Sequence, residues 1–303
     1  MPNCNSTHAR RGVSAAVLLC LVLLPARSAS GWGAGGHMMT ARIAFDRLNP
    51  RAQAEAARLM EIPINPADVT KRRLGFFRGS VWPDDVRSRP GFEFSGNLHF
   101  ADFPFSVDST PLPDLPKPQN VIKALGRYAE VLKTSTDDDE RAQALRFIIH
   151  FVGDIHQPLH CSTRVDEALP DGDQGGNLFF VHTPHRTKLH SFWDGGLDTF
   201  PKGGGPPDFE PPTQDVIDAA VVSILKQHPD TNKLLRLEDP TNFQLWADES
   251  SYLAQKYAYA NRKLKPESTL TGSYKRRGTW LARRRVAWGG YRLAALLNSV
   301  WPG

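Results

Sequence analysis

An apolar run near the middle of the chain contains ionisable side chains that a folded protein has to neutralise. Within Phe147–His160, large apolar residues fall on nearly every side of a helix, which is the pattern of a buried helix. His150 and Asp154 are four residues apart, so a helix projects both from one face. Because an unpaired buried carboxylate is strongly unfavourable, Asp154 is expected to meet a cation or a metal. The alternative is a core histidine and a structural carboxylate that are satisfied by hydrogen bonds.

The first 31 residues have the pattern of a secretory signal peptide. Arg10 and Arg11 precede an apolar run over residues 13–24, and small residues follow up to Gly31. The sequence therefore predicts a signal peptide at 1–31 and an exported protein, secreted or periplasmic, that begins at Trp32. Export by the twin-arginine route stays an alternative to the general route. No later run is long enough for a membrane anchor.

Cleavage before Trp32 changes the cysteine count and the charge. It would leave Cys161 as the single cysteine, so no intrachain disulfide is expected despite the export. Removing Arg10, Arg11 and Arg27 lowers the formal net charge from +5 to +2. A chain with so small a net charge has no global basic field for nucleic acid, and any affinity for anions must be local.

The remaining 32–303 region is expected to be one mainly α domain with a small β-hairpin. Helices are predicted at 34–48, from 50 onwards, at 72–82 ending before Pro83, at 120–132, from an acidic start at 137–140 through the central run, and at 187–197, 214–227, 242–263 and 279–298. The segments 101–118, 166–177 and 203–212 are predicted loops, and 178–182 is a predicted hairpin strand. The last helix carries Arg283–Arg285 and is interpreted as a core helix, with a surface for membrane or nucleic acid as the alternative.

The His–Asp pair of the central run occurs a second time. His190 and Asp194 are also four residues apart in an apolar helical context. Further ionisable residues with large apolar neighbours are Asp84, His99 and His160. Imidazoles and carboxylates together form a zinc-type ligand set, with manganese or iron as less favoured occupants. Cys161 is interpreted as a buried small residue rather than a ligand.

A further ligand is the new chain terminus. Cleavage before Trp32 would create an α-amine five residues before His37, with an ordinary pKa of about 8. The amine and the carbonyl of Trp32 can chelate one metal.

Six motifs, spread in order over residues 32–194, together resemble the trinuclear-zinc single-strand nucleases of the S-one/P-one (S1/P1) family. They are Trp32-Gly-x-x-Gly-His37, Trp82-x-Asp84-x-x-Arg87, His99-Phe100, His150-x-x-x-Asp154 continuing to Gln157-Pro-Leu-His160, Gly175-Gly-Asn177, and His190-x-x-x-Asp194. Segments near Trp246–Ser250 and Arg292–Asn298 extend the resemblance towards the C-terminus.

The resemblance implies three zinc ions per chain. Asp84, His99, His150 and Asp154 would hold one ion, Trp32, His37 and Asp154 a second, and His160, His190 and Asp194 a third. Asp154 would then bridge two metals. A metal cluster of this kind can activate water and stabilise charge on a phosphate ester.

The resemblance also implies how substrate is held. Arg87 would stabilise the phosphate, Phe100 would stack on a base, Asp102 would accept hydrogen bonds from the base edge, and Asn177 would contact substrate. For Arg87 the alternative is an ion pair with Asp85 or another neighbour, and for Phe100 it is core packing.

The implied activity is hydrolysis of single-stranded RNA and DNA to 5′-phosphorylated products, together with removal of 3′-phosphates from nucleotides, by a monomer. A zinc-dependent phospholipase C acting on phospholipid and a non-catalytic secreted zinc-binding module are the rival interpretations. The formal dinucleotide fingerprint Gly31-x-Gly33-x-x-Gly36 lacks the strand that should precede it, so a dinucleotide site is not expected.

Overall fold

The computed structural model describes residues 32–64, 75–115, 120–203, 210–230 and 239–303. The predicted signal peptide, the start of the predicted helix at 72–82, and parts of the loops at 101–118 and 203–212 lie outside the described residues. The helices are α1 (Ala34–Phe45), α2 (Pro50–Met60), α3 (Gly75–Gly79), α4 (Trp82–Val86), η1 (Glu93–His99), α5 (Val121–Thr134), α6 (Asp138–His156), η2 (Pro158–Cys161), α7 (Leu189–Asp194), α8 (Gln214–Gln227), α9 (Phe243–Leu253), the π-helix η3 (Ala254–Ala258) and α10 (Gly272–Val300).

Side-chain caps begin several of these helices at the positions that the sequence indicates. Asn49 caps α2 through the backbone N–H of Ala52, and Asn120 and Asp137 cap α5 and α6. A polar side chain at this position satisfies one of the backbone N–H groups that the first helical turn leaves without a partner. The predicted starts of these three helices are therefore confirmed.

The helix predicted to end before Pro83 is wrong in its boundary. The structure has two short helices there, α3 and α4, and Pro83 lies in the first turn of α4. A proline is tolerated in a first turn because the N–H that it lacks would have no acceptor within the helix. This arrangement brings Asp84 into a helical turn that faces α6.

Three further predicted helices have different boundaries. The helix predicted from 279 begins earlier, as α10 at Gly272. The segment predicted as helical from 187 starts as the strand β4 (Arg186–Lys188), and α7 follows it. The segment predicted as helical to 263 leaves α-geometry after Leu253, continues as η3, and ends where Ala260, Asn261 and Arg262 take positive φ values.

In the described part of the chain, five short strands form two small sheets. β1 (Pro104–Ser106) pairs in parallel with β2 (Thr163–Val165), so the predicted loop at 101–118 contains a strand whose Phe105 is buried. β3 (Phe180–His182) pairs antiparallel with β4 and in parallel with β5 (Ser268–Thr269). The predicted hairpin and the mainly α fold class are confirmed.

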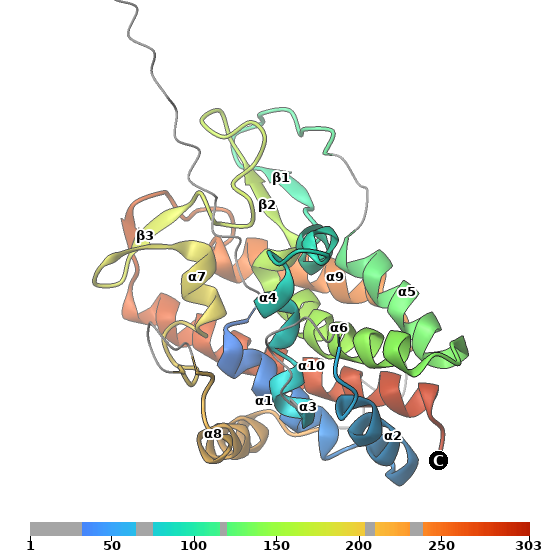
Figure 1. Ribbon diagram of the computed structural model, residues 1–303. Coiled ribbons are helices and arrows are strands. Elements are labelled where there is room, and N and C mark those ends of the chain that lie inside the picture. Colours follow the sequence, from blue (N-terminus) through green and yellow to red (C-terminus); the bar gives the residue numbers. More distant parts are fainter. Residues whose placement is uncertain (1–31, 65–74, 116–119, 204–209, 231–238) are drawn as a thin grey trace, which may run out of the picture.

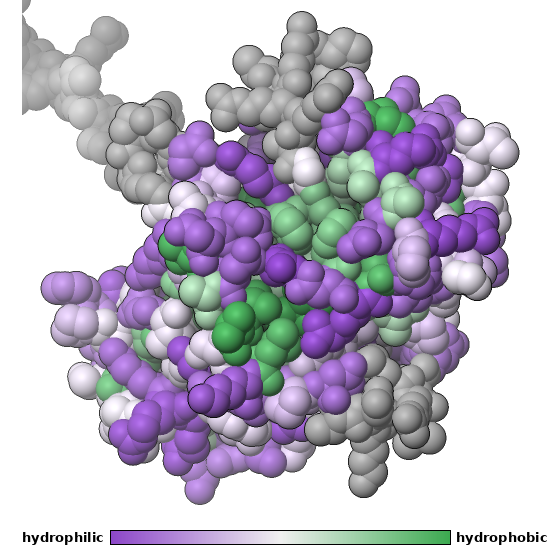
Figure 2. Space-filling view, turned by 90° about the horizontal axis from the view of Figure 1, so that it is seen from below, coloured by the Kyte–Doolittle hydropathy of each residue, from purple (hydrophilic) through white to green (hydrophobic). Residues whose placement is uncertain are grey.

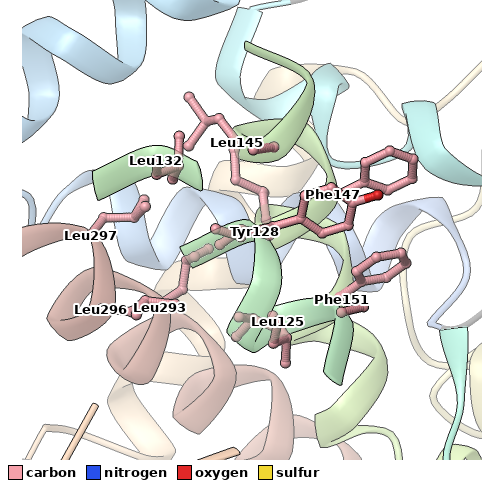
Figure 3. Packing of buried hydrophobic residues seen from close by; sticks show 14 of the residues in the cluster. Leu125, Tyr128, Leu132, Leu145, Phe147, Phe151, Leu293, Leu296 and Leu297 are labelled. Atoms are coloured by element: carbon pink, nitrogen blue, oxygen red, sulfur yellow. The ribbon is translucent and has the colours of Figure 1, made fainter. Parts of the chain in front are cut away.

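Helix α6 lies in the interior and packs against α5, α10, α2 and α9 (Figure 1). Figure 3 shows side chains from α5, α6 and α10 meeting in one apolar cluster. In that cluster Tyr128 stacks on Phe147, with ring centroids 4.9 Å apart. A second cluster gathers around α7, β3, η3 and the first half of α10. The side of α6 that carries His150 and Asp154 is left to face polar partners.

Helix α10 is a core helix, as the sequence indicates. Arg285 is fully buried, whereas Arg283 and Arg284 are partly exposed. On the face shown in Figure 2, hydrophilic residues surround a smaller central area of hydrophobic ones. Within the described residues, no helix is both long and apolar enough to cross a membrane.

Candidate metal centre

Among the residues that the structure describes, three groups of imidazole and carboxylate side chains meet beside α6. In each group the possible ligand atoms all lie within 4.8 Å of one another. The groups are His37, His150 and Asp154; Asp84, His99 and His150; and His160, His190 and Asp194. They come from α1, α4, η1, α6, η2 and α7, so residues separated by up to about half of the chain converge at one place.

Asp154 lies at the centre of this arrangement. Its Oδ2 is 3.0 Å from Nδ1 of His99 and 3.2 Å from Nε2 of His150. Its Oδ1 is 3.4 Å from Nε2 of His37 and 3.8 Å from Nδ1 of His160. Both oxygens of one fully buried carboxylate are therefore surrounded by imidazoles.

Backbone carbonyls fix the orientation of three of the histidines. Nδ1 of His150 donates to the carbonyl of Ser80 at 2.7 Å, and Nδ1 of His160 donates to that of His99 at 2.7 Å. Nδ1 of His190 donates to the carbonyl of Gly175 at 2.6 Å. A carbonyl can only accept, so Nδ1 carries the proton in each ring and Nε2 is left to face the cluster. This is the usual support for a metal-binding histidine.

The two Nε2 atoms of His160 and His190 are only 3.1 Å apart. Because the Nδ1 protons are committed to carbonyls, the two Nε2 lone pairs oppose each other unless a proton or a metal lies between them. Such a contact needs a cation between the two nitrogens. Asp194 lies beside the pair, with Oδ2 3.6 Å from Nε2 of His190.

The His37 side chain packs against α6 at the position of Gly153, which has no side chain. Its ring stacks on that of His150, with centroids 3.9 Å apart. A Cβ atom on Gly153 would lie 2.5 Å from Nδ1 of His37, well inside van der Waals contact. Only glycine at position 153 lets the first turn of α1 approach α6 so closely.

Asp84 and Arg87 approach the cluster from α4. Oδ1 of Asp84 is 3.6 Å from Nε2 of His150 and 3.7 Å from Nδ1 of His99. Nη1 of Arg87 is 3.2 Å from the same oxygen, so the guanidinium lies at the edge of the cluster. Arg87 thus forms an ion pair with a neighbour, as the alternative interpretation of the sequence allowed, but the neighbour is the candidate metal ligand Asp84 and both side chains are largely buried.

Gln157 holds the carboxylate of Asp194 in the second His–Asp pair, although the sequence indicated this residue only as part of a motif. Nε2 of Gln157 donates to Oδ1 of Asp194 at 2.6 Å, and its Oε1 accepts from the backbone N–H of Leu159 at 2.6 Å. One buried amide thereby holds both the carboxylate of α7 and the turn that carries His160. Together with Gly153, it is a site residue that the sequence reasoning missed, and its only sequence signal is a polar side chain in an apolar run.

The electrostatics of the cluster favour a cation. Burial, followed by repulsion from His150, lowers the pKa of His37 to about 4. Burial also acts to lower the pKa of His150, but the carboxylates of Asp154 and Asp84 outweigh it and raise this pKa to about 9. Burial raises the pKa of Asp194 well above its ordinary value, and the negative charges of Asp84 and Asp154 add to this. The carboxylates therefore attract either protons or a metal.

The donor set fits a metal of the zinc type. Several buried atoms find no hydrogen-bond partner among the described residues: both ring nitrogens of His37, Oδ1 of Asp84, Nε2 of His99 and Oδ1 of Asp154. Each such atom would cost about 1–3 kcal/mol if it stayed unpaired. Nitrogen and carboxylate oxygen donors without a thiolate are ordinary zinc ligands. Cys161 is buried and donates weakly to the carbonyl of Ile155, which agrees with its interpretation as a core residue.

The other predicted site residues lie next to these ligands in the chain. Trp32 is fully buried, and the N–H of the following Gly33 donates to the carbonyl of Asp194 at 2.9 Å. Phe100 directly follows His99 and is half-buried. Burial, with repulsion from Asp173, raises the pKa of Asp102 to about 6.

Asn177 lies in the loop that supports His190. Its side-chain amide donates to the carbonyl of Gln174 at 2.9 Å, and the following turn returns to α7. The Gly176 carbonyl accepts from the backbone N–H of His190 at 3.2 Å. The described contacts give Asn177 a role in shaping this loop.

Buried charges hold the C-terminal end of α6, where Asp154 lies. Nε of Arg285 donates to the carbonyl of His156 at 3.1 Å, and its Nη2 donates to Ser250 Oγ at 2.7 Å. Ser250 Oγ donates in turn to the carbonyl of Ile155 at 2.5 Å. Glu249 accepts from Arg285 at 3.0 Å and so neutralises it. The carbonyls that the last helical turn leaves open are thus satisfied from α9 and α10.

Arg292 completes this support. It pairs with Glu249 at 2.7 Å, and its Nη1 lies 3.0 Å from Nε2 of His156. Burial, then the charges of Arg285 and Arg292, lower the pKa of His156 well below its ordinary value, so the ring is neutral and can accept. His156 therefore belongs to the support of α6 and not to the ligand groups.

Comparison with known proteins gives one family and several curated relatives. The model of the S1/P1 Nuclease family matches residues 32–302. Endonuclease 1 of Arabidopsis thaliana is 29% identical over 94% of this chain and 92% of its own length. Nuclease S1 of Aspergillus oryzae is 25% identical over 89% of this chain and 92% of its length. Nuclease P1 of Penicillium citrinum is 30% identical over 54% of this chain and 57% of its length.

Proposed function

The chain belongs to the S1/P1 nuclease family, and on that premise we propose that it is an exported zinc-dependent phosphodiesterase. It hydrolyses single-stranded RNA and DNA to 5′-phosphorylated products and removes 3′-phosphates from nucleotides. Residues 1–31 are the signal peptide and residues 32–303 the catalytic domain, which acts as a monomer.

The observation that carries this proposal is the convergence of imidazole ring nitrogens and carboxylates in the three neighbouring groups. The His160–His190 contact at 3.1 Å supports a cation most directly, because two opposed imidazole lone pairs repel. A stability-only metal site would need one closed set of ligands, whereas three adjoining groups suit chemistry on a phosphate ester.

Three zinc ions per chain are proposed. The first ion is held by Asp84, His99, His150 and Asp154. The second is held by Trp32, His37 and Asp154, and the third by His160, His190 and Asp194. Zinc supplies Lewis-acid chemistry there, activating water and withdrawing charge from phosphate oxygens. Three zinc ions would carry a formal charge of +6 and the three aspartates −3, so the site would keep a positive charge that suits a phosphate anion.

The chain's own residues orient the substrate. Arg87 presents a planar guanidinium at the edge of the cluster and binds the phosphate by paired hydrogen bonds. Phe100 stacks on the base, and Asp102 accepts hydrogen bonds from the base edge while Asn177 contacts the bound nucleotide. A duplex hides its base faces, so this set of contacts selects single strands.

The test measures metal content, products and substrate class on the mature protein. We expect three zinc ions per chain, release of acid-soluble nucleotides from single-stranded RNA and DNA, and free phosphate from 3′-nucleotides. Release of phosphocholine from phospholipid without nucleotide release would show the rival phospholipase activity. Tight binding of single-stranded DNA without hydrolysis by zinc-replete protein would show the non-catalytic alternative.

The terminal ligand is tested separately. A variant with one extra residue before Trp32 cannot offer the Trp32 α-amine to a metal, so it should lose one zinc and most of its activity. The matched control carries an extra residue at the C-terminus after Gly303. Full activity of the N-terminally extended form would refute ligation by the terminus while leaving the nuclease assignment intact.

A further inference from the structure

A groove between α9–η3 and α10 carries aromatic and basic side chains that the metal centre does not use. A cavity of about 200 Å³ opens there, and none of its lining residues is one of the candidate metal ligands. A second, shallower hollow of about 270 Å³ adjoins it, and Tyr252 lines both.

One wall of the groove is a stripe along α10. Trp280, Arg284 and Trp288 are spaced four residues apart and so lie on one face of the helix. The Arg284 guanidinium lies over both indoles, 5.3 Å from the Trp280 ring and 4.2 Å from the Trp288 ring. Among the described residues, its side chain makes no ion pair with a carboxylate. Its charge is therefore available to an anion.

The opposite wall repeats the pattern. Lys256 Nζ lies 5.3 Å from the Tyr252 ring and 5.7 Å from the Tyr257 ring. Both Lys256 and Tyr257 belong to the π-helix η3, and π-helical turns are frequently found at functional sites. Tyr252 is 59% exposed and Trp280 is 43% exposed, so two large rings stand in solvent at the mouth of the cavity.

The charge of the groove is positive. Four cations line the two hollows against one carboxylate, Glu249, which gives a formal net charge of +3. The four cations are Lys256, Arg262, Arg284 and Arg285. Glu249 is already paired with Arg285 and Arg292. An anionic occupant is favoured over a neutral sugar or another cationic surface.

We propose that this groove is an accessory site for unpaired bases of a single-stranded nucleic acid whose scissile phosphate lies at the metal centre. The groove is defined by Tyr252, Lys256, Tyr257, Trp280, Arg284 and Trp288. Alternating aromatic faces and cations bind such strands, because bases stack on the rings and phosphates meet the charges. Pockets for drug-sized ligands have about 300–1,000 Å³, so a cavity of about 200 Å³ suits a single base rather than a whole nucleotide. The proposal rests on the proposed nuclease function.

The test compares a dinucleotide with a single-stranded oligonucleotide of about 20 nucleotides, longer than the roughly 4–16 nucleotides that single-strand-binding folds cover. With the zinc-replete enzyme, Trp280→Ala and Arg284→Ala should each raise KM for the oligonucleotide at least about fivefold, which corresponds to about 1 kcal/mol for one stacked base. The kcat value and the kinetics on the dinucleotide should stay unchanged, because the groove binds ground state and transition state alike.

Two controls separate stacking from general charge. Trp280→Phe keeps an aromatic face and should retain most of the wild-type KM. Arg51→Ala removes one exposed cation from α2, outside the groove, and should leave KM unchanged. If Arg51→Ala raised KM as much as Arg284→Ala, the loss of affinity would come from general electrostatic attraction and not from the groove. That result would overturn the proposal.

Other results also decide the matter. An oligonucleotide KM within about twofold of wild type in both variants would overturn the accessory site and leave the nuclease function standing. Loss of vesicle binding or a changed oligomeric state in Trp280→Ala, with unchanged oligonucleotide KM, would assign the groove to a membrane or to a second copy. If wild type cleaves neither substrate, the proposed function has failed, and fluorescence anisotropy with the uncut oligonucleotide then judges the groove alone.

Discussion

Gly153→Ala tests whether the approach of α1 to α6 builds the metal centre. The added Cβ would lie 2.5 Å from Nδ1 and 2.9 Å from Cε1 of His37, whereas ordinary contacts begin at about 3.5 Å. His37 must therefore move by about 1 Å, although it is fully buried and stacked on His150. The substitution changes no candidate ligand, so any loss of metal comes from geometry alone.

The expected magnitudes follow from two opposing effects. Alanine in a helix interior stabilises by about 0.5–1 kcal/mol relative to glycine, and overpacking a tight core costs about 1–3 kcal/mol. The net loss of unfolding free energy should therefore be small, about 0–2.5 kcal/mol. A displacement of about 1 Å at the reacting groups can lower the rate about 100-fold. Activity should thus fall far more than stability, with one zinc fewer per chain.

The measurements are zinc content by elemental analysis, kcat/KM on single-stranded DNA, and urea unfolding with and without zinc. Gly126→Ala is the matched control, since Gly126 lies within α5 and its added Cβ would have no neighbour within 4 Å. It should gain about 0.5–1 kcal/mol and keep its zinc. Wild-type zinc content and activity in Gly153→Ala would refute the reasoning that this close approach positions His37.

Three further predictions concern single side chains. Gln157→Ala removes the amide that holds Asp194, so zinc affinity measured by chelator competition should fall about 10–100-fold, and an unchanged affinity would contradict this role. Although burial opposes it, Arg292 and Arg285 hold the pKa of Glu249 below its ordinary 4.5, so the wild-type protein should lose stability as the pH falls below about 4.5. The Glu249→Gln variant should be less stable than wild type near neutral pH and should lose less stability in acid. Thermal melts at several pH values will measure both differences. Burial raises the pKa of Asp102 to about 6, so KM for a nucleotide should rise as pH falls through about 6, and Asp102→Asn should flatten that profile; an identical profile would exclude Asp102 from base binding.

The fold was predictable where local signals agree with tertiary packing. Asn49, Asn120 and Asp137 begin helices because a capping side chain acts within four residues of chain. The boundaries near Pro83 and Leu253 were not predictable in this way. A proline ends one helix or begins another with equal ease, and the change to a π-helix after Leu253 depends on packing against other elements.

The site was predictable to the extent that ligands come in pairs on a helix. His150 with Asp154, and His190 with Asp194, follow from a spacing of four. Which pair faces which other residue depends on the path of the chain, as the contact of His160 with His190 illustrates. Gly153 escaped notice because a missing side chain leaves no chemical signal in a sequence. Whether these residues bind three zinc ions stays a prediction.

The carbonyls of Ser80, His99 and Gly175, which accept from three imidazoles, have an evolutionary consequence. A backbone carbonyl is present whatever the residue, so no single side-chain replacement deletes these partners. Related chains can therefore diverge at such positions and retain the ring orientations, provided that the local backbone course survives. Insertions or deletions nearby should be far more damaging than substitutions. At Gly175 the margin is narrower, because its φ of +61° and the carbonyl of Leu159, 2.4 Å from an added Cβ, also resist any side chain.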